Sequence, residues 1–259
     1  IRDRFIVAEL RNPAPLLQIR LLAERNFGIS MAVLTLFAIG MLGGTYLLPL
    51  YMQRGLGYTA LMAGSVFLPV GLIQGVLSAV SGYLTRYVKP LLLAAAGILL
   101  LATSFWLASR FTLHTTHGHI LFILYLRGFG MGLTFAPLNL FSLKNLTQQD
   151  MAAAAGISNS IKQLAGSIGI ALLTVIFSAR TSYHAAHETV SAAQTYVEGV
   201  TDALRVVAVI TLAALLPLLG VFRKKRPGKS GVKGAATPSP GEAVSGKTDK
   251  TTIYRTKPE

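Results

Sequence analysis

Long uncharged stretches are the feature that most constrains how this chain can fold. No charged residue occurs between Arg25 and Arg54, and none occurs between Arg54 and Arg86. About 20 apolar residues in a helix cross the roughly 30 Å hydrocarbon core of a bilayer. Only 13% of the residues are charged, whereas about a quarter are charged in a soluble domain. The sequence therefore predicts an all-α integral membrane protein.

Six segments are apolar and long enough to be membrane-spanning helices. They cover residues 27–52, 60–83, 90–109, 119–142, 153–178 and 203–222. Residues 1–26 are predicted to be a lead-in, and residues 27–222 a six-span bundle. From Arg223 onward Lys, Gly, Ser, Thr and Pro dominate, so residues 223–259 are predicted to be a disordered basic tail. The first residue is Ile1 rather than Met, which suggests a start inside a longer polypeptide.

The distribution of basic residues predicts the orientation in the membrane. With an even number of spans, both ends of the chain lie on the same side. That side carries eighteen of the 24 Lys and Arg residues, and the loops on the other side carry only Arg54, Arg110 and Arg180. Because cytoplasmic loops are enriched in Lys and Arg, both termini are expected in the cytoplasm. The net charge of +14 is thus a topology signal, and nucleic acid is not an expected partner.

Ionisable side chains are rare within the predicted spans. Asp202 lies at the outer end of the last span and not in its interior. All five histidines fall in outer loops or at a span edge. Proton-driven transporters normally use an intramembrane Asp, Glu or His, so a proton carrier is not expected in this chain. Neither a metal site nor an enzymatic catalytic pair is predicted. The intramembrane charges are Arg127 and Lys162, and for Lys162 snorkelling to the cytoplasmic interface is the alternative to a functional role.

Arg127 lies in a span that also holds three glycines and a proline, ILYLRGFGMGLTFAPLN. Its depth is on the order of 12 Å, where a charge should face a bundle interior or a watery cavity. Helical geometry puts Arg127 and Thr134 on one face, and the packing pair Gly128 and Gly132 on another. Pro137 can bend this helix. Two hypotheses stay open: Arg127 handles substrate or coupling, or it binds a neighbouring span and holds the fold.

Several segments resemble, in order, the fourteen-span drug/proton antiporters of the major facilitator superfamily, the EmrB/QacA type. The segments are PLLQIRLLAERNF, YLLPLYMQRGLGYTALMAG (46–64), YLRGFGMGLTFAPLN, AAAAGISNSIKQLAGSIGIALL (152–173) and SARTSYHAAH (178–187). They are similar to stretches in and around the family's ninth to thirteenth spans. The resemblance implies the C-terminal six-helix half of such a transporter, with the first eight spans and their proton-carrying acids outside this chain.

The resemblance also implies which side chains act in transport. In this superfamily the first and fourth spans of each half line the substrate cavity, and the second and fifth add to it. The implied cavity residues are Tyr46, Tyr51, Gln53, Gln74, Arg127, Thr134, Asn139, Asn159 and Gln163. The loop GYLTRYVKP (82–90) keeps Gly82, Arg86 and Lys89 of a superfamily gating motif but lacks its Asp and second Gly. These three residues, with Arg127 and Lys162, are implied in gating or coupling.

The expected function is half of a proton-coupled multidrug efflux transporter that exports small amphipathic compounds by alternating access. Its expected location is the bacterial inner membrane, its energy source the proton gradient, and it needs no cofactor. The implied partners are the N-terminal half of the same transporter, the lipid bilayer and, in a Gram-negative cell, a periplasmic adaptor protein. Two alternatives stay open: a transporter of the same fold for a specific natural substrate such as a siderophore or lipid, and a truncated six-span accessory protein.

Overall fold

The computed structural model describes residues 21, 24–143, 146–148, 150–187 and 191–224, and every regular element in them is a helix. Six of the helices are long and apolar enough to cross a membrane. The predicted all-α, six-span fold is therefore confirmed. Most of the predicted lead-in and nearly all of the predicted basic tail lie outside the described residues.

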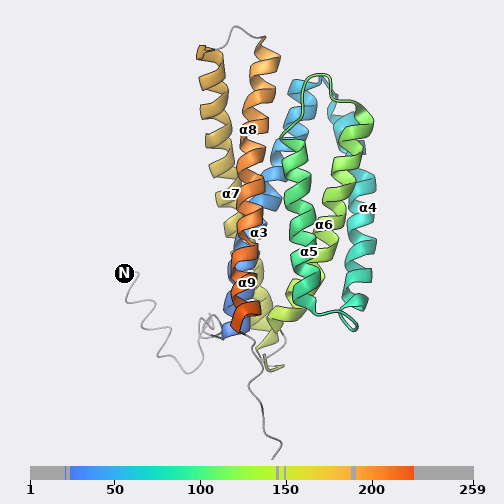
Figure 1. The fold of residues 1–259 in the computed structure, drawn as a ribbon, viewed down its shortest axis with the longest axis vertical. Coiled ribbons are helices and arrows are strands. Elements are labelled where there is room, and N and C mark those ends of the chain that lie inside the picture. The colour runs from blue at the N-terminus through green and yellow to red at the C-terminus, as the bar shows by residue number, and fades with distance from the viewer. Residues whose placement is uncertain (1–20, 22–23, 144–145, 149, 188–190, 225–259) are drawn as a thin grey trace, which may run out of the picture. The chain divides into compact units, whose positions relative to one another are not determined.

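The helices follow one another with short connections (Figure 1). They are α3 (Arg25–Leu50) with its π-helical continuation η1 (Tyr51–Gly55), α4 (Ala60–Leu84), α5 (Pro90–Ala108), α6 (His117–Leu143), α7 (Met151–His187), α8 (Ala192–Ala213) and α9 (Leu215–Lys224). Successive spans run in opposite directions, so the start of α3, the α4–α5 turn, the start of α7 and the end of α9 lie at one end of the bundle. Arg86 and Lys89 lie at this end.

Capping residues fix where several helices begin. The Thr59 hydroxyl accepts a hydrogen bond from the Met62 backbone N–H at 3.2 Å, and the Ser191 hydroxyl accepts one from Gln194 at 3.3 Å. Such caps satisfy donors that a helix leaves free at its N-terminus. Pro90 is the first residue of α5, a position that needs no backbone N–H. These signals explain why α4 and α5 begin where the sequence predicts.

The bundle consists of two sets of three helices, α3 to α5 and α6 to α8, which interleave. The first helix of the first set, α3, packs against α7 and α8, whereas α6 packs against α4 and α5. The first helix of each set thus contacts the second and third helices of the other set. Helices α5 and α8 also pack against each other and link the two sets. This exchange makes the six spans a single packing unit.

Glycines on α6 allow its closest contacts with neighbouring helices. A Cβ added to Gly132 would lie 2.7 Å from the Leu77 Cβ, and one added to Gly128 would lie 3.1 Å from the Val70 carbonyl oxygen, both on α4. Gly130 faces α5 instead. The structure thus places Gly128 and Gly132 on one packing face, as the sequence interpretation expects, and Pro137 is buried further along the same helix.

The last two long helices correct the prediction. α7 continues to His187 and α8 begins at Ala192, so the predicted spans 153–178 and 203–222 are wrong at these ends. Most of the predicted outer loop is helical. A helix of 37 residues is about 55 Å long, well beyond the roughly 30 Å hydrocarbon thickness. Hydropathy detects only the apolar part of a helix. The polar extensions of α7 and α8 pack against each other, which hydropathy does not detect.

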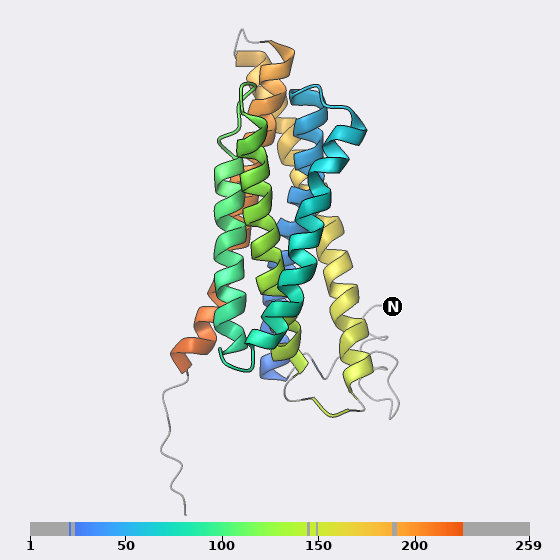
Figure 2. The ribbon, with the colours of Figure 1, turned by 90° about the vertical axis from the view of Figure 1, so that its right-hand side faces the viewer.

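Helices α4 and α7 are the least covered part of the bundle. Their most apolar windows have mean hydropathies of 1.9 and 1.6, yet only 17% and 22% of these windows are buried, against 50–56% in the other four spans. On α4 Leu68 and Leu72 are exposed, and on α7 Leu164 and Ile168 are exposed. Figure 2 shows α7 diverging from α4 and α6 toward the end where α7 begins. These apolar faces need lipid or another protein segment to cover them.

Candidate functional site

Arg127 is buried among three helices. The residue is 2% exposed. Its guanidinium donates to the carbonyls of Met41 at 3.1 Å and Gly44 at 3.4 Å, and to the Thr45 hydroxyl, all on α3. It also lies over the Phe105 ring of α5, 5.3 Å from the centroid. Arg127 lines none of the pockets described here, and its role in a transport cavity stays a prediction. The side chain joins α6 to α3 and α5, as the alternative hypothesis states.

Two other predicted cavity residues are also buried in packing contacts. Thr134 is 0% exposed, its hydroxyl donates to the Gly130 carbonyl at 2.8 Å, and it packs against Gly97 of α5. Tyr51 is 0% exposed, its hydroxyl donates to the Thr112 carbonyl at 2.7 Å, and its ring stacks on Phe111. Buried polar groups need hydrogen-bond partners, because leaving them unsatisfied costs free energy. Both hydroxyls therefore hold helix contacts rather than line a cavity.

Four further predicted cavity residues are dispersed over the bundle. Tyr46 is 40% exposed, Gln53 and Gln163 are exposed, and Gln74 is half-buried. The carbonyl of Gln74 lies 3.0 Å from the position of a Cβ added to Gly132, so this part of α4 serves helix packing. None of the four lines the pocket that brings the remaining predicted residues together.

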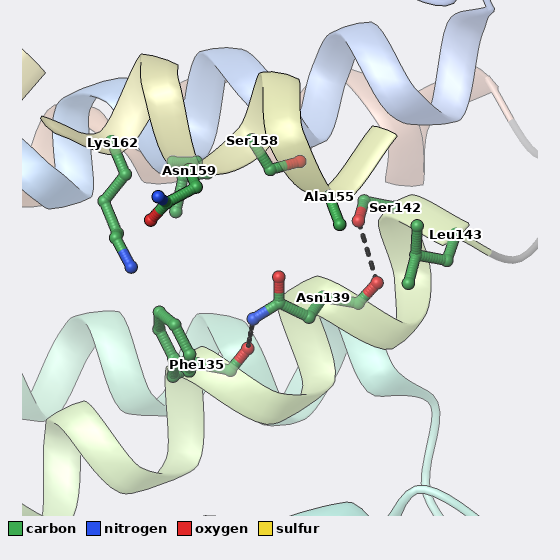
Figure 3. A pocket seen from close by; sticks show the side chains of 9 residues that line it. Phe135, Asn139, Ser142, Leu143, Ala155, Ser158, Asn159 and Lys162 are labelled. Atoms are coloured by element: carbon green, nitrogen blue, oxygen red, sulfur yellow. Dashed lines mark hydrogen bonds between the residues drawn. The ribbon is translucent and has the colours of Figure 1, made fainter. Parts of the chain in front are cut away.

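A pocket between α6 and α7, with α3 contributing one residue, unites Asn139, Asn159 and Lys162 (Figure 3). Its volume is about 120 Å³, and it is lined by Leu34, Phe135, Asn139, Ser142, Leu143, Ala155, Ser158, Asn159 and Lys162. Lys162 extends from α7 across the opening toward Phe135 on α6, and Asn159 lies beside it on α7. The mixture of apolar wall and few polar groups is typical of small-molecule sites.

The polar groups of this pocket differ in what they already bind. The Asn139 amide nitrogen donates to the Phe135 carbonyl at 2.8 Å, and the hydroxyls of Ser142 and Ser158 donate to backbone carbonyls of their own helices. Lys162 has a single described contact, with its Nζ 5.1 Å from the centroid of the Phe135 ring. Within the described residues no carboxylate pairs with Lys162. The pocket therefore presents an ammonium group that is free to bind.

A charged cluster that the sequence interpretation missed joins α7 to α8. Asp202 lies 2.7 Å from Arg205, 3.1 Å from the His184 Nε2 and 3.7 Å from Arg180. The other ring nitrogen of His184 lies 3.5 Å from Glu198. Arg180 and His184 are four residues apart, as are Glu198 and Asp202, and such spacing puts each pair on one helix face. The wrong loop assignment concealed this signal.

Most of the chain matches a known protein family. The sequence pattern that describes the Major Facilitator Superfamily matches residues 3–170, which is more than half of the chain. The chain belongs to the major facilitator superfamily. Its members are transporters rather than enzymes, and the six apolar helices agree with a multi-pass membrane protein.

Relatives of this transporter sequence include drug exporters. It is 33% identical over 187 residues to the multidrug export protein EmrB of Escherichia coli K12, covering 72% of this chain and 36% of EmrB. It is 31% identical over 180 residues to the uncharacterized MFS-type transporter YhcA of Bacillus subtilis, covering 70% and 34%. It is 29% identical over 180 residues to the fatty acid resistance protein FarB of Neisseria gonorrhoeae, covering 70% and 36%. The alignments span about a third of these relatives' lengths, and the resemblance to EmrB-type transporters is confirmed.

The superfamily gating motif lies at the α4–α5 turn. The Gly82 carbonyl accepts a hydrogen bond from the Thr85 hydroxyl at 2.6 Å, and no atom lies within 4 Å of a Cβ added to Gly82. Arg86 lies over the Tyr83 ring, 5.4 Å from its centroid, and Lys89 directly precedes α5. The side chains of Arg86 and Lys89 are exposed. The gating role of Gly82, Arg86 and Lys89 stays a prediction.

Proposed function

We propose that this chain forms the C-terminal half of a proton-coupled efflux transporter that exports amphipathic compounds. The pocket between α6 and α7 carries this proposal, because it combines an aromatic ring with an ammonium group that has no ion-pair partner in the described part of the chain. An ionisable side chain at such a position is a candidate for substrate handling, since its burial in lipid without a partner is unfavourable. The relatives named for multidrug export and fatty acid resistance support the choice of amphipathic substrates.

The uncovered faces of α4 and α7 support a two-bundle mechanism. In the proposal an N-terminal six-helix half of the same polypeptide packs on these faces, and the pocket then borders the interface between the halves. Alternating access follows from rocking one half against the other around that interface. The exposed α4–α5 turn, with Arg86 and Lys89, then contacts the other half when the cytoplasmic side closes.

The proton carrier of this mechanism is proposed to lie in the N-terminal half. Arg127 is engaged by carbonyls of α3, and Lys162 faces the pocket between α6 and α7. The carboxylates of Glu198 and Asp202 belong to the ion pairs that join α7 to α8. Proton coupling, a bacterial inner-membrane location, cytoplasmic termini and an adaptor partner are all parts of the proposal, and the transporter needs no bound cofactor.

Transport by the full-length protein tests the proposal. The complete transporter, expressed in a drug-sensitive bacterial host, should lower the accumulation of a fluorescent amphipathic dye. A protonophore should abolish this effect, because it collapses the driving gradient. A matched control is the same protein with the α4–α5 turn deleted. Equal dye accumulation with and without the intact transporter, across several amphipathic dyes, would contradict the proposal.

A further inference from the structure

The pocket between α6 and α7 is lined by a single charged side chain. Lys162 is the one ionisable residue among its nine lining residues, and none of them is acidic. We propose that this pocket is an anion subsite in which Lys162 binds the carboxylate head of an amphipathic substrate. This inference deepens the proposed export function and rests on it for the step from binding to transport.

The two intramembrane cations have different partners, and the difference assigns the ligand site to Lys162. Arg127 donates to two carbonyls and a hydroxyl of α3 and is 2% exposed. Lys162 is half-buried and contacts the Phe135 ring without a hydrogen bond or ion pair in the described part of the chain. It lies 11 residues after the start of α7 at Met151, about 16 Å along the helix. An ammonium group at that position gains from a mobile anion that neutralises it.

Available hydrogen-bond donors favour a carboxylate over a neutral or cationic head group. The hydroxyls of Ser142 and Ser158 and the Asn139 amide nitrogen already donate to backbone carbonyls. The Asn139 amide keeps a second N–H. The Lys162 ammonium and the Asn159 amide, both on α7, donate no hydrogen bond within the described residues (Figure 3). A carboxylate accepts from both, and hydrogen bonds between ionised partners are the stronger class. A cationic head group would meet the ammonium of Lys162.

The size of the pocket indicates how much of a ligand it holds. Its volume of about 120 Å³ is below the roughly 300–1,000 Å³ of a complete small-molecule site. It therefore fits a head group and its first carbon atoms, and the remaining hydrocarbon lies along the apolar surface outside it. Phe135, Leu34 and Leu143 supply the apolar part of the wall next to Lys162 and Asn159.

Binding of matched amphipaths to the full-length transporter tests the subsite. Dodecanoate, its methyl ester and dodecylamine share one chain and differ in head-group charge. In phosphatidylcholine nanodiscs we expect the wild type to bind dodecanoate most tightly. The Lys162→Met variant should raise the Kd for dodecanoate about tenfold or more and change the Kd for the ester by less than about twofold. Lys162→Arg should retain most of the preference, and Arg110→Met, which removes an exposed cation in the turn after α5, should change neither value.

Two results would overturn the subsite. One is an equal loss of dodecanoate and ester binding in Lys162→Met, which would make the residue structural. The other is Lys162-dependent binding of phosphatidylglycerol with no binding of dodecanoate in phosphatidylcholine nanodiscs, which would assign the pocket to a lipid head group. Export from inverted vesicles distinguishes the proposed anion subsite from the proposed transport function. Lys162-dependent binding without export of any amphipath supports the anion subsite and contradicts the transport function.

Discussion

The guanidinium of Arg127 on α6 donates to the main-chain carbonyl of Met41 on α3 across 3.1 Å. These residues are separated by 86 positions in the sequence, and they join the first helices of the two interleaved sets. Arg127, which the sequence predicted to line a transport pathway, therefore holds helices together in this structure. Lys162, at the pocket between α6 and α7, has no carboxylate partner among the described residues.

Replacing Arg127 with Met should destabilise the bundle. The change removes hydrogen bonds from α6 to α3 and the contact with the Phe105 ring. We expect a loss of about 1–3 kcal/mol in the free energy of unfolding, measured by thermal unfolding of the purified full-length transporter. Arg110→Met is the control, since Arg110 is exposed. An unchanged melting temperature combined with lost export would restore a substrate role for Arg127.

Two glycine substitutions should have opposite effects on stability. A Cβ on Gly132 would lie 2.7 Å from the Leu77 Cβ and 3.0 Å from the Gln74 carbonyl, so Gly132→Ala should push α6 away from α4. We expect a cost of about 1–3 kcal/mol from overpacking. Nothing lies within 4 Å of a Cβ on Gly156 of α7, so Gly156→Ala should be neutral or stabilise by up to about 1 kcal/mol. Equal melting temperatures for the two variants would contradict this packing.

Removing the hydroxyl of Tyr51 should affect stability rather than transport. Tyr51→Phe keeps the stacking on Phe111 but loses the hydrogen bond to the Thr112 carbonyl. The expected loss is about 0.5–1.5 kcal/mol. Tyr46→Phe is the matched control, because Tyr46 is 40% exposed and no hydrogen bond to its hydroxyl is described. If Tyr51→Phe changes the substrate preference of the transporter at unchanged stability, Tyr51 lines the transport pathway after all.

Asp202 should be more important for the α7–α8 pairing than its exposed partner. The Asp202 side chain is 16% exposed and contacts Arg180, His184 and Arg205, whereas Arg205 is 57% exposed. Asp202→Asn should speed amide hydrogen exchange at the start of α8 and the end of α7, because the ion pairs that join these extensions are lost. Arg205→Gln should change exchange little, since exposed ion pairs contribute about 0–1 kcal/mol. Similar exchange rates in both variants would argue against a central role for Asp202.

Sequence alone determined the membrane character, the six spans and the packing face of α6. These features depend on local properties, because hydropathy over 20 residues and the 3.6-residue helical period need no knowledge of the partner. The glycine pair Gly128 and Gly132 lies against α4 for the same reason. The resemblance to drug antiporters likewise follows from consecutive segments of the chain.

Only the tertiary structure decided which polar side chains meet. The carbonyls that bind Arg127 lie more than 80 positions away in the sequence. The acids that contact His184 lie in the first part of α8, which hydropathy assigned to a loop. Helical period gives the direction of a side chain around its own axis, but not the helix it faces. The pairing of α6 with α3 gives Arg127 its hydrogen-bond partners, whereas Lys162 lines the pocket between α6 and α7 with no ion-pair partner among the described residues.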